Sequence, residues 1–158
     1  MKQIKYIWLK IGVLAFFLFS VHQVSGQKEA TNWLLGPYGG ITFRSGVPEE
    51  YIPDGSPSAS VTSSISDSQG NLLFYTDGQS VYDRFHRKMP QGSGLKGSPY
   101  TSSTQIVPKP GDPNRFLVFT IPGNGLGAPP EASYYSEVDM CLNSGFGDVL
   151  ENTKNTVL

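Results

Sequence analysis

Three observations predict an all-β protein arranged as an incomplete β-propeller. Glycine, proline, serine and asparagine recur every few residues after residue 26, and no window keeps apolar residues at i, i+3, i+4 and i+7, so no helix is expected. The segments Leu72–Tyr75 and Phe116–Phe119 are each apolar at four successive positions. They belong to stretches that repeat at offsets of 41 and 44 residues. A propeller blade has roughly this length, and a neighbouring blade on each face lets its central strand be apolar on both sides.

Residues 1–26 are predicted to be a cleaved secretory signal peptide. Three lysines precede an uncharged run at positions 11–21, and small residues follow at positions 24–26. The run is about half of the roughly 20 apolar residues that a membrane-spanning helix needs. We therefore expect export, to the cell surface or the medium, with no membrane insertion after cleavage.

The exported chain, residues 27–158, is mildly acidic. Cleavage removes three lysines and no acidic residue, which leaves nine basic and 13 acidic side chains, a net charge of −4, on 132 residues. Long-range charge therefore draws it neither to nucleic acid nor to an anionic membrane surface. Its single cysteine, Cys141, cannot close an internal disulfide, so the core alone must stabilise the domain.

The strands are expected where short apolar or alternating runs lie between turn residues. In chain order they are Trp33–Leu35, Gly40–Phe43, Val61–Ser66, Asn71–Thr76, Ser80–Asp83, Thr104–Pro108, Arg115–Ile121, Tyr134–Met140 and Thr156–Leu158. The turns, rich in proline, aspartate, asparagine and glycine, are Pro53–Gly55, Asp67–Gly70, Asp77–Gly78, Pro110–Asn114 and Asn143–Gly145.

The repeat extends over three strands of each copy. Residues 64–76 match residues 105–120 position for position apart from a longer turn, and Ser80–Asp83 is matched with Ser136–Asp139 after an inserted loop at 122–133. This predicts about two blades of four antiparallel strands plus a partial first blade. Propellers close with roughly four to eight blades, so residues 27–158 are expected to be the N-terminal part of a longer protein. The alternative fold is a two-sheet β-sandwich, in which one face of each sheet more often meets water.

A resemblance to a known group of proteins rests on four stretches. These are NWLLGPYGGITFRSG (32–46), SISDSQGNLLFYTDGQSVYD (64–83), MPQGSGLKGSPYTSSTQIVPKPGDPNRFLVFTI (89–121) and YYSEVDMCLNSGFGDV (134–149). Together they resemble the N-terminal β-propeller region of large secreted surface proteins of gliding, Bacteroidetes-type bacteria. The resemblance implies surface display or secretion, downstream adhesion modules such as PKD domains, and a sorting signal for type IX secretion. It carries no catalytic residues over, and the loop at 123–131 is longer than the resemblance implies.

Aromatic residues form the first set of candidates for ligand binding. Trp33, Tyr134 and Tyr135, together with Tyr38 and Tyr100, can form a platform on which a sugar stacks, or can pack in the core and between blades. Packing in the core or between blades is the favoured role.

Basic residues form the second set. Arg84 and Arg87 lie in the run Arg-Phe-His-Arg-Lys at 84–88, which can bind a sulfate or a carboxylated sugar or can be a solvated strand end and turn. An extracellular glycan, polymer or surface protein is the partner that either set of candidates would serve.

No catalytic residue, metal ligand or cofactor is predicted. The glycines of residues 92–97 satisfy G-x-G-x-x-G, but proline and a serine-threonine run follow where a dinucleotide site needs a helix. Residues 78–82 lack the closing glycine of a nucleophile elbow. Residues 67–78 have their glycine at the fourth position, whereas a calcium-binding loop has it at the sixth. His86 is the only histidine after cleavage, which excludes a two-histidine metal site within this segment.

Two functions of different classes remain. The favoured one is a non-catalytic surface or adhesion protein, associated with attachment or gliding motility, whose loops bind a ligand. The alternative is the N-terminal part of a secreted carbohydrate-active enzyme whose acid and base lie in blades beyond this segment. Glycoside hydrolysis needs two carboxylates at a defined separation, and nothing in the sequence indicates that any two of the repeat aspartates, Asp67, Asp77, Asp83 and Asp139, converge.

Overall fold

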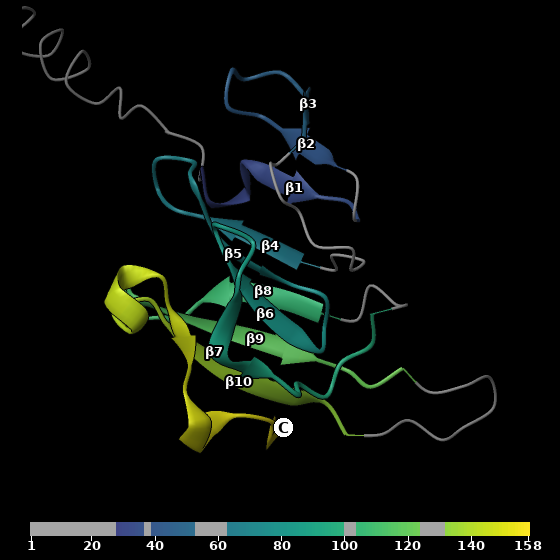
Figure 1. Ribbon diagram of the computed structural model, residues 1–158, viewed down its shortest axis with the longest axis vertical. Helices are drawn as coiled ribbons and strands as arrows, with labels where there is room; N and C mark the ends of the chain where they lie inside the picture. The colour runs from purple at the N-terminus through teal and green to yellow at the C-terminus, as the bar shows by residue number, and fades with distance from the viewer. Residues whose placement is uncertain (1–27, 37–38, 53–62, 100–103, 124–131) are drawn as a thin grey trace, which may run out of the picture.

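The computed structural model describes residues 28–36, 39–52, 63–99, 104–123 and 132–158 (Figure 1). These residues form three antiparallel sheets and three short 3-10 turns, and no α-helix occurs among them. The expected all-β class is therefore confirmed. The predicted signal peptide, the turn at 53–55 and most of the loop at 122–133 lie outside the described residues.

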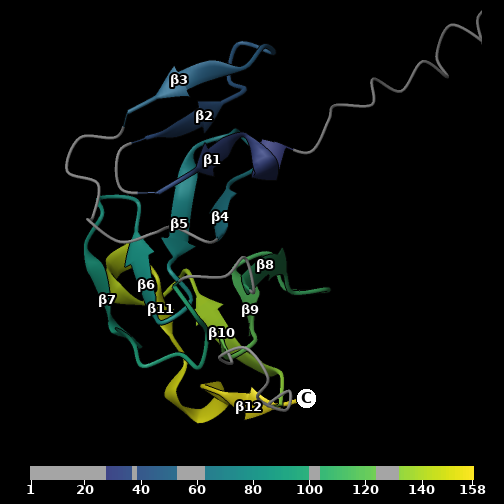
Figure 2. The ribbon, with the colours of Figure 1, turned by 90° about the vertical axis from the view of Figure 1, so that its right-hand side faces the viewer.

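The first sheet lies at one end of the long axis of the molecule, and the second and third sheets lie beside each other over much of the remaining length (Figures 1 and 2). The first sheet consists of β1 (Asn32–Leu34), β2 (Gly40–Thr42) and β3 (Glu49–Tyr51). The second consists of β4 (Ser63–Ser66), β5 (Leu72–Thr76), β6 (Ser80–Asp83) and β7 (Lys88–Ser93). The third consists of β8 (Thr104–Pro108), β9 (Arg115–Thr120), β10 (Tyr134–Asp139) and β11 (Asp148–Val149), with β12 (Thr156–Val157) also paired to β10. The 3-10 turns are η1 (Lys28–Ala30), η2 (Asn143–Gly145) and η3 (Glu151–Thr153).

Neighbouring sheets meet along their first strands. β1 lies against β4, and β4 lies against β8, so the first strands of the three sheets are consecutive neighbours. β7 and β11, the fourth strands of the second and third sheets, also lie against each other. Each of these two sheets is a simple meander in chain order, which is the repeat that the sequence predicts.

The middle sheet is covered on both faces. On one face, Leu72 and Tyr75 of β5 pack with Leu34 of the first sheet. On the other face, Phe74 of β5 contacts Phe116 of the third sheet edge-to-face, with ring centroids 5.4 Å apart. Phe74 and Tyr75 are neighbours in sequence, and both are fully buried. This double cover explains why β5 has no polar face.

A β-bulge explains how four apolar residues fit the two faces of β5. Ile65 of β4 pairs with Phe74, but the next residue, Ser66, pairs with Leu72, so Leu73 is an extra residue in the strand. Leu73 consequently packs on the same side as Phe74, whereas Leu72 returns to the side of the first sheet. Without the bulge, strict alternation would place Leu72 with Phe74.

Among the described residues, the second sheet covers one face of the apolar run of β9 and no sheet covers the other. Phe116 and Val118 are buried against the second sheet. Leu117 and Phe119 point to the other face and are half-buried, and Ile121 beyond the strand is exposed. The pairing of β9 with β8 has no bulge, so its side chains alternate regularly.

The pairing registers correct one detail of the repeat. Thr76 of β5 pairs with Val81, and the matching Thr120 of β9 pairs with Tyr134. Val81 therefore corresponds to Tyr134, three residues before the Glu137 that the sequence match assigns to it. The sequence match followed the shared serine and aspartate, whereas hydrogen bonding to the central strand sets the register.

Candidate functional site

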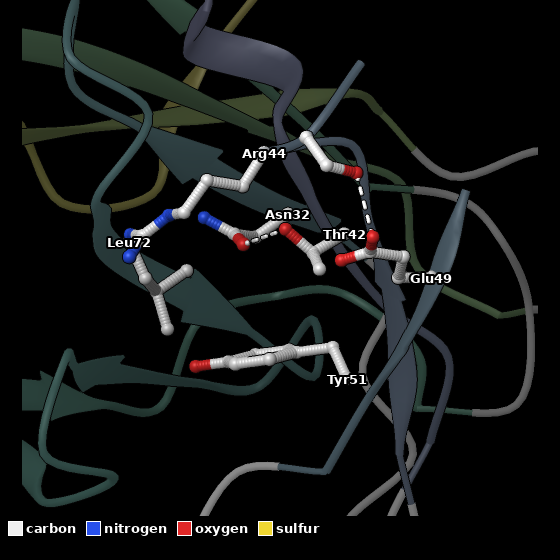
Figure 3. Close-up of a pocket in the computed structure, with 7 residues that line it drawn as sticks. Asn32, Thr42, Arg44, Glu49, Tyr51 and Leu72 are labelled. Atoms are coloured by element: carbon white, nitrogen blue, oxygen red, sulfur yellow. Dashed lines mark hydrogen bonds between the residues drawn. The ribbon is translucent and has the colours of Figure 1, made fainter. Parts of the chain in front are cut away.

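A cavity lies where the first sheet meets β5, and we name it the Arg44 pocket (Figure 3). Its volume is about 430 Å³. It is lined by Asn32, Thr42, Arg44, Ser45, Glu49, Tyr51 and Leu72. Except for Leu72, all of these residues come from the first sheet and the turn between β2 and β3.

Strand pairing places the polar residues of the pocket on one face of the first sheet. Asn32 pairs with Thr42, and Thr42 pairs with Glu49, so the three side chains form a row across the sheet. Tyr51, two residues after Glu49, points to the same face. Trp33 follows Asn32 directly and therefore points to the opposite face, away from the pocket.

Asn32 is the fixed centre of this row. It is buried, and its Nδ2 donates to the Ser66 hydroxyl and to the Gly70 carbonyl, both at 2.9 Å. Its Oδ1 accepts from the Thr42 hydroxyl at 3.0 Å. The amide therefore joins the first sheet to the second and orients Thr42 at the pocket wall.

Two charged side chains complete the wall without forming an ion pair with each other. Arg44 donates through Nη2 to Asn71 Oδ1 at 3.1 Å, and among the described residues no carboxylate lies within ion-pair distance of it. Glu49 accepts a hydrogen bond from the Ser45 hydroxyl at 2.7 Å. Each charge thus keeps hydrogen-bonding capacity for a bound molecule.

Tyr51 supplies the apolar surface of the pocket. In Figure 3 its ring lies flat beneath the side chains of Asn32, Thr42 and Arg44, with Leu72 to one side. Burial raises the pKa of the Tyr51 hydroxyl, and the nearby Arg44 charge lowers it by less. The hydroxyl is therefore protonated at neutral pH and can both donate and accept.

An aromatic ring facing a row of polar groups is suited to holding a sugar ring, which has apolar faces and hydroxyl edges. Glu49 is the single carboxylate among the described lining residues. General acid and base catalysis of glycoside cleavage uses two. The arrangement is thus suited to binding.

The structure does not bring the predicted aromatic platform together. Trp33 is half-exposed on the far face of the first sheet and contacts Phe43 edge-to-face. Tyr134 and Tyr135 are consecutive on β10 of the third sheet, so they point to opposite faces. Tyr134 is buried, while Tyr135 is half-buried beside Phe119. Two further members of the predicted set lie outside the described residues: Tyr38 and Tyr100.

The predicted basic residues do lie together. The guanidinium groups of Arg84 and Arg87 both lie against the rings of Phe85 and Phe146, beside a second cavity of about 320 Å³. The run at 84–88 signalled the charges. Phe146 is far away in sequence and was not predicted to belong to the group.

The repeat aspartates have a common local role. Each carboxylate accepts a hydrogen bond through Oδ1 from the backbone N–H two residues later: Asp67 from Gln69, Asp77 from Gln79, Asp83 from Phe85 and Asp139 from Cys141. This is the pattern of an Asx turn, in which the side chain imitates a backbone turn. Hydrogen bonds from Asn71 and Gln69 lower the pKa of Asp67 although burial acts in the opposite direction.

The remaining motifs add no chemistry to the described residues. The glycines of residues 92–97 lie at the end of β7 and in the loop after it, and the next element that the structure describes is the strand β8. Within the described ranges, no group of three or more histidine, cysteine, aspartate or glutamate side chains is arranged to hold a metal ion. The described part of the chain also has no helix with the length and apolarity needed to cross a bilayer.

Comparisons with protein-family models, with curated proteins and with solved structures gave no match to this chain. The case for a function therefore depends on the geometry of the Arg44 pocket and on the sequence.

Proposed function

We propose that this chain is a non-catalytic, carbohydrate-binding segment of a secreted or cell-surface protein. The observation that carries the proposal is the Arg44 pocket, in which the ring of Tyr51 lies opposite Asn32, Thr42 and Arg44 (Figure 3). Aromatic faces contact the apolar face of a sugar ring, and fixed amide, hydroxyl and guanidinium groups hydrogen-bond its hydroxyl edge. The predicted signal peptide supports export.

The proposal includes the finer architecture, with the three sheets as a partial first blade and two blades of an incomplete β-propeller. The consecutive contact of the first strands β1, β4 and β8 supports it, because the inner strands of neighbouring blades are adjacent. The double cover of β5 supports it as well. The same proposal makes the chain the N-terminal part of a longer surface protein of the gliding-bacterium type.

A β-sandwich of the second and third sheets is the competing architecture. Phe74 and Val118 match in the repeat, yet both lie in the core between these two sheets. In a propeller, successive blades are related by a rotation, so matched residues would face the same side of their own blades and would not point toward each other. The contact between β7 and β11 also favours a sandwich. A crystal structure of the longer protein decides between the two by showing whether a further sheet covers Phe119.

The binding proposal is tested with the purified, exported chain on an array of neutral and acidic oligosaccharides, followed by calorimetric titration of the bound sugars. Tyr51→Ala removes the ring, and we expect it to weaken binding about tenfold, which corresponds to about 1.4 kcal/mol. Trp33→Ala removes an aromatic ring from the opposite face of the same sheet and should leave the affinity unchanged.

Either of two outcomes would refute this proposal. One is the absence of binding to every sugar on the array. The other is an equal loss of affinity in Tyr51→Ala and Trp33→Ala, which would mean that the ring of Tyr51 has no special contact with the ligand.

A further inference from the structure

A second polar site lies at the turn between β6 and β7. Arg84 and Arg87 flank one pair of rings: the Arg84 guanidinium carbon is 5.7 Å from the centroid of Phe85 and 5.3 Å from that of Phe146, and the corresponding Arg87 distances are 5.1 and 4.9 Å. The two rings contact each other edge-to-face at 5.4 Å. We name these four residues the Arg–Phe cluster. These cation–π contacts restrict the motion of the two guanidinium groups.

A buried carboxylate fixes the position of Arg87. Asp83 is 2% exposed, and its Oδ2 accepts from Arg87 Nε at 3.0 Å and from Nη2 at 2.8 Å. Its Oδ1 accepts from the backbone N–H groups of Phe85 and Arg87. The Arg87 side chain is nevertheless 59% exposed, so its planar group is held in place while part of it faces solvent.

The local charge is not balanced by the protein. Arg84 and Lys88 have no carboxylate within ion-pair distance among the described residues, whereas Arg87 pairs with Asp83. Three cations and one carboxylate therefore gather at this turn, on a chain whose overall formal charge is −1. Like charges held together are unfavourable, and an anionic ligand relieves that repulsion.

A cavity of about 320 Å³ adjoins the charges. Its walls include Arg87, Lys88 and Phe146 together with Asn143 and Ser144 of η2. Asn143 and Ser144 have φ angles of 50° and 57°, in the left-handed region that residues other than glycine adopt at a cost. Two successive residues of this kind place an amide and a hydroxyl next to the cationic side chains.

We propose that the Arg–Phe cluster and this cavity bind an acidic polysaccharide through a sulfate ester or carboxylate group. Asp83 occupies the Nε–Nη2 side of the Arg87 guanidinium, and the remaining N–H groups of Arg87 can donate to such an anion, while Lys88 adds a point charge. Phe85 is 57% exposed and offers apolar surface for the sugar that carries the anion. This site and the Arg44 pocket are supported by separate observations, so failure of one proposal leaves the other standing.

The test uses the whole exported chain and three polymers: dextran sulfate, the carboxylated polymer alginate, and uncharged dextran. Binding is measured by calorimetry at low and at high salt. We expect dextran sulfate and alginate to bind more weakly at high salt, because screening weakens contacts between exposed charges. Uncharged dextran should not bind at this site. If uncharged dextran binds as tightly as the acidic polymers to the Tyr51→Ala chain, in which the Arg44 pocket lacks its ring, the proposal is wrong.

The decisive variant is the double substitution Arg84→Gln/Lys88→Gln. It removes the two cations without carboxylate partners and leaves the Asp83–Arg87 pair intact, so the turn should remain folded. We expect at least a tenfold loss of affinity for dextran sulfate. The matched control, Lys28→Gln/Lys96→Gln, changes the net charge equally and should change the affinity less than twofold. Equal losses in both would indicate diffuse attraction and overturn the site.

Two further measurements distinguish a polysaccharide site from a site for small anions. Arg87→Lys keeps the charge and removes the planar fork, so it should weaken binding severalfold while the melting temperature confirms that the chain is folded. Inorganic sulfate should compete with dextran sulfate only at concentrations far above those of the polymer's sulfate groups. Equal potency of the free ion would show that the sugar makes no contact, and would contradict the proposal.

Discussion

The strands β5 and β9 have similar sequences but different surroundings. Leu72–Tyr75 in β5 lies between two sheets, and each of its faces enters a separate cluster. Phe116–Phe119 in β9 has the second sheet on one face, while Leu117 and Phe119 on the other face are half-buried. An apolar run therefore shows that a strand is suited to burial on both sides, whereas its position in the stack decides how many sides are covered.

The two faces of β5 also differ in chemistry. The cluster toward the third sheet is mainly aliphatic, with Phe74 and Phe116 as its aromatic members. The cluster toward the first sheet contains Tyr75, with Tyr51 and Tyr82 packed against it, and the rings of Tyr75 and Tyr82 stack at 5.2 Å. On the face toward the third sheet, stability therefore depends mainly on the volume of the side chains. On the face toward the first sheet, stability also depends on pH.

The sharpest test of the comparison is a pair of single-residue deletions. Deleting Leu117 from the regular strand β9 moves Phe116 to the open face and Arg115 toward the core, so we expect a loss of more than about 4 kcal/mol in the free energy of unfolding. Deleting Leu73 removes only the bulge residue, and Leu72 keeps its face by simple alternation. That loss should be about 1 to 2 kcal/mol, the value of one partly buried leucine.

Urea unfolding, followed by circular dichroism, measures both deletions under the same conditions. Comparable losses in the two variants would show that Leu73 is not a dispensable extra residue, and that the bulge does not set the faces of β5.

The next effect in size comes from truncating matched aromatic side chains. Phe74→Ala should lower the free energy of unfolding by about 3 to 5 kcal/mol, because the side chain is fully buried and leaves a cavity. Phe119→Ala should cost about 1 to 2 kcal/mol, because the side chain is only partly buried. Chemical denaturation again gives the two values. A cost for Phe119→Ala equal to that for Phe74→Ala would mean that the outer face of β9 is covered in solution.

The smallest effect concerns the face of β5 that contains Tyr75. Its contribution to the pH dependence of stability is negligible at neutral pH and grows in alkali. Burial raises the pKa of Tyr75, and the neighbouring Tyr82, Asp83 and Asp77 raise it further. Burial also raises the pKa of Tyr82 and of Tyr51. The folded state therefore holds these protons more tightly than the unfolded chain, whose tyrosines ionise near pH 10. The stabilisation is complete below about pH 10 and is lost as the pH rises above it.

Thermal melts between about pH 8 and 11 check this expectation, and Tyr75→Phe is the matched variant because it keeps the ring and removes the ionisable hydroxyl. We expect the melting temperature of the parent chain to fall more steeply above pH 10 than that of the variant. Parallel curves would exclude Tyr75 as a source of the pH dependence.

Much of the fold follows from the sequence because short apolar runs and turn residues are local signals. The all-β class, the repeat and β5 were predicted on that basis. β3 was missed because Glu49–Tyr51 begins with two charged residues, and β7 because it contains Pro90 and Gly92. Both strands are set by pairing with a neighbour, and pairing is not visible in the strand's own residues.

The candidate sites were less predictable, since they combine residues from separate segments. Tyr51 and Arg44 come together because β2 and β3 pair, and a prediction of that hairpin would have placed Thr42 beside Glu49 on one face. Phe146 reaches the arginines of the β6–β7 turn from the third sheet, and the sequence carries no signal for this contact. Arg84 and Arg87 could be predicted as candidates from the sequence because they lie in one short basic run.

Asp83 connects the interior of the molecule to its surface. The carboxylate closes a turn through two backbone N–H groups and, at the same time, grips the guanidinium of Arg87. One carboxylate thus holds both the turn and the orientation of that cation, and an anion bound as proposed above would also stabilise this end of the hairpin by mass action. Under that proposal, a substitution at Asp83 changes both the binding of the anion and the stability of this turn.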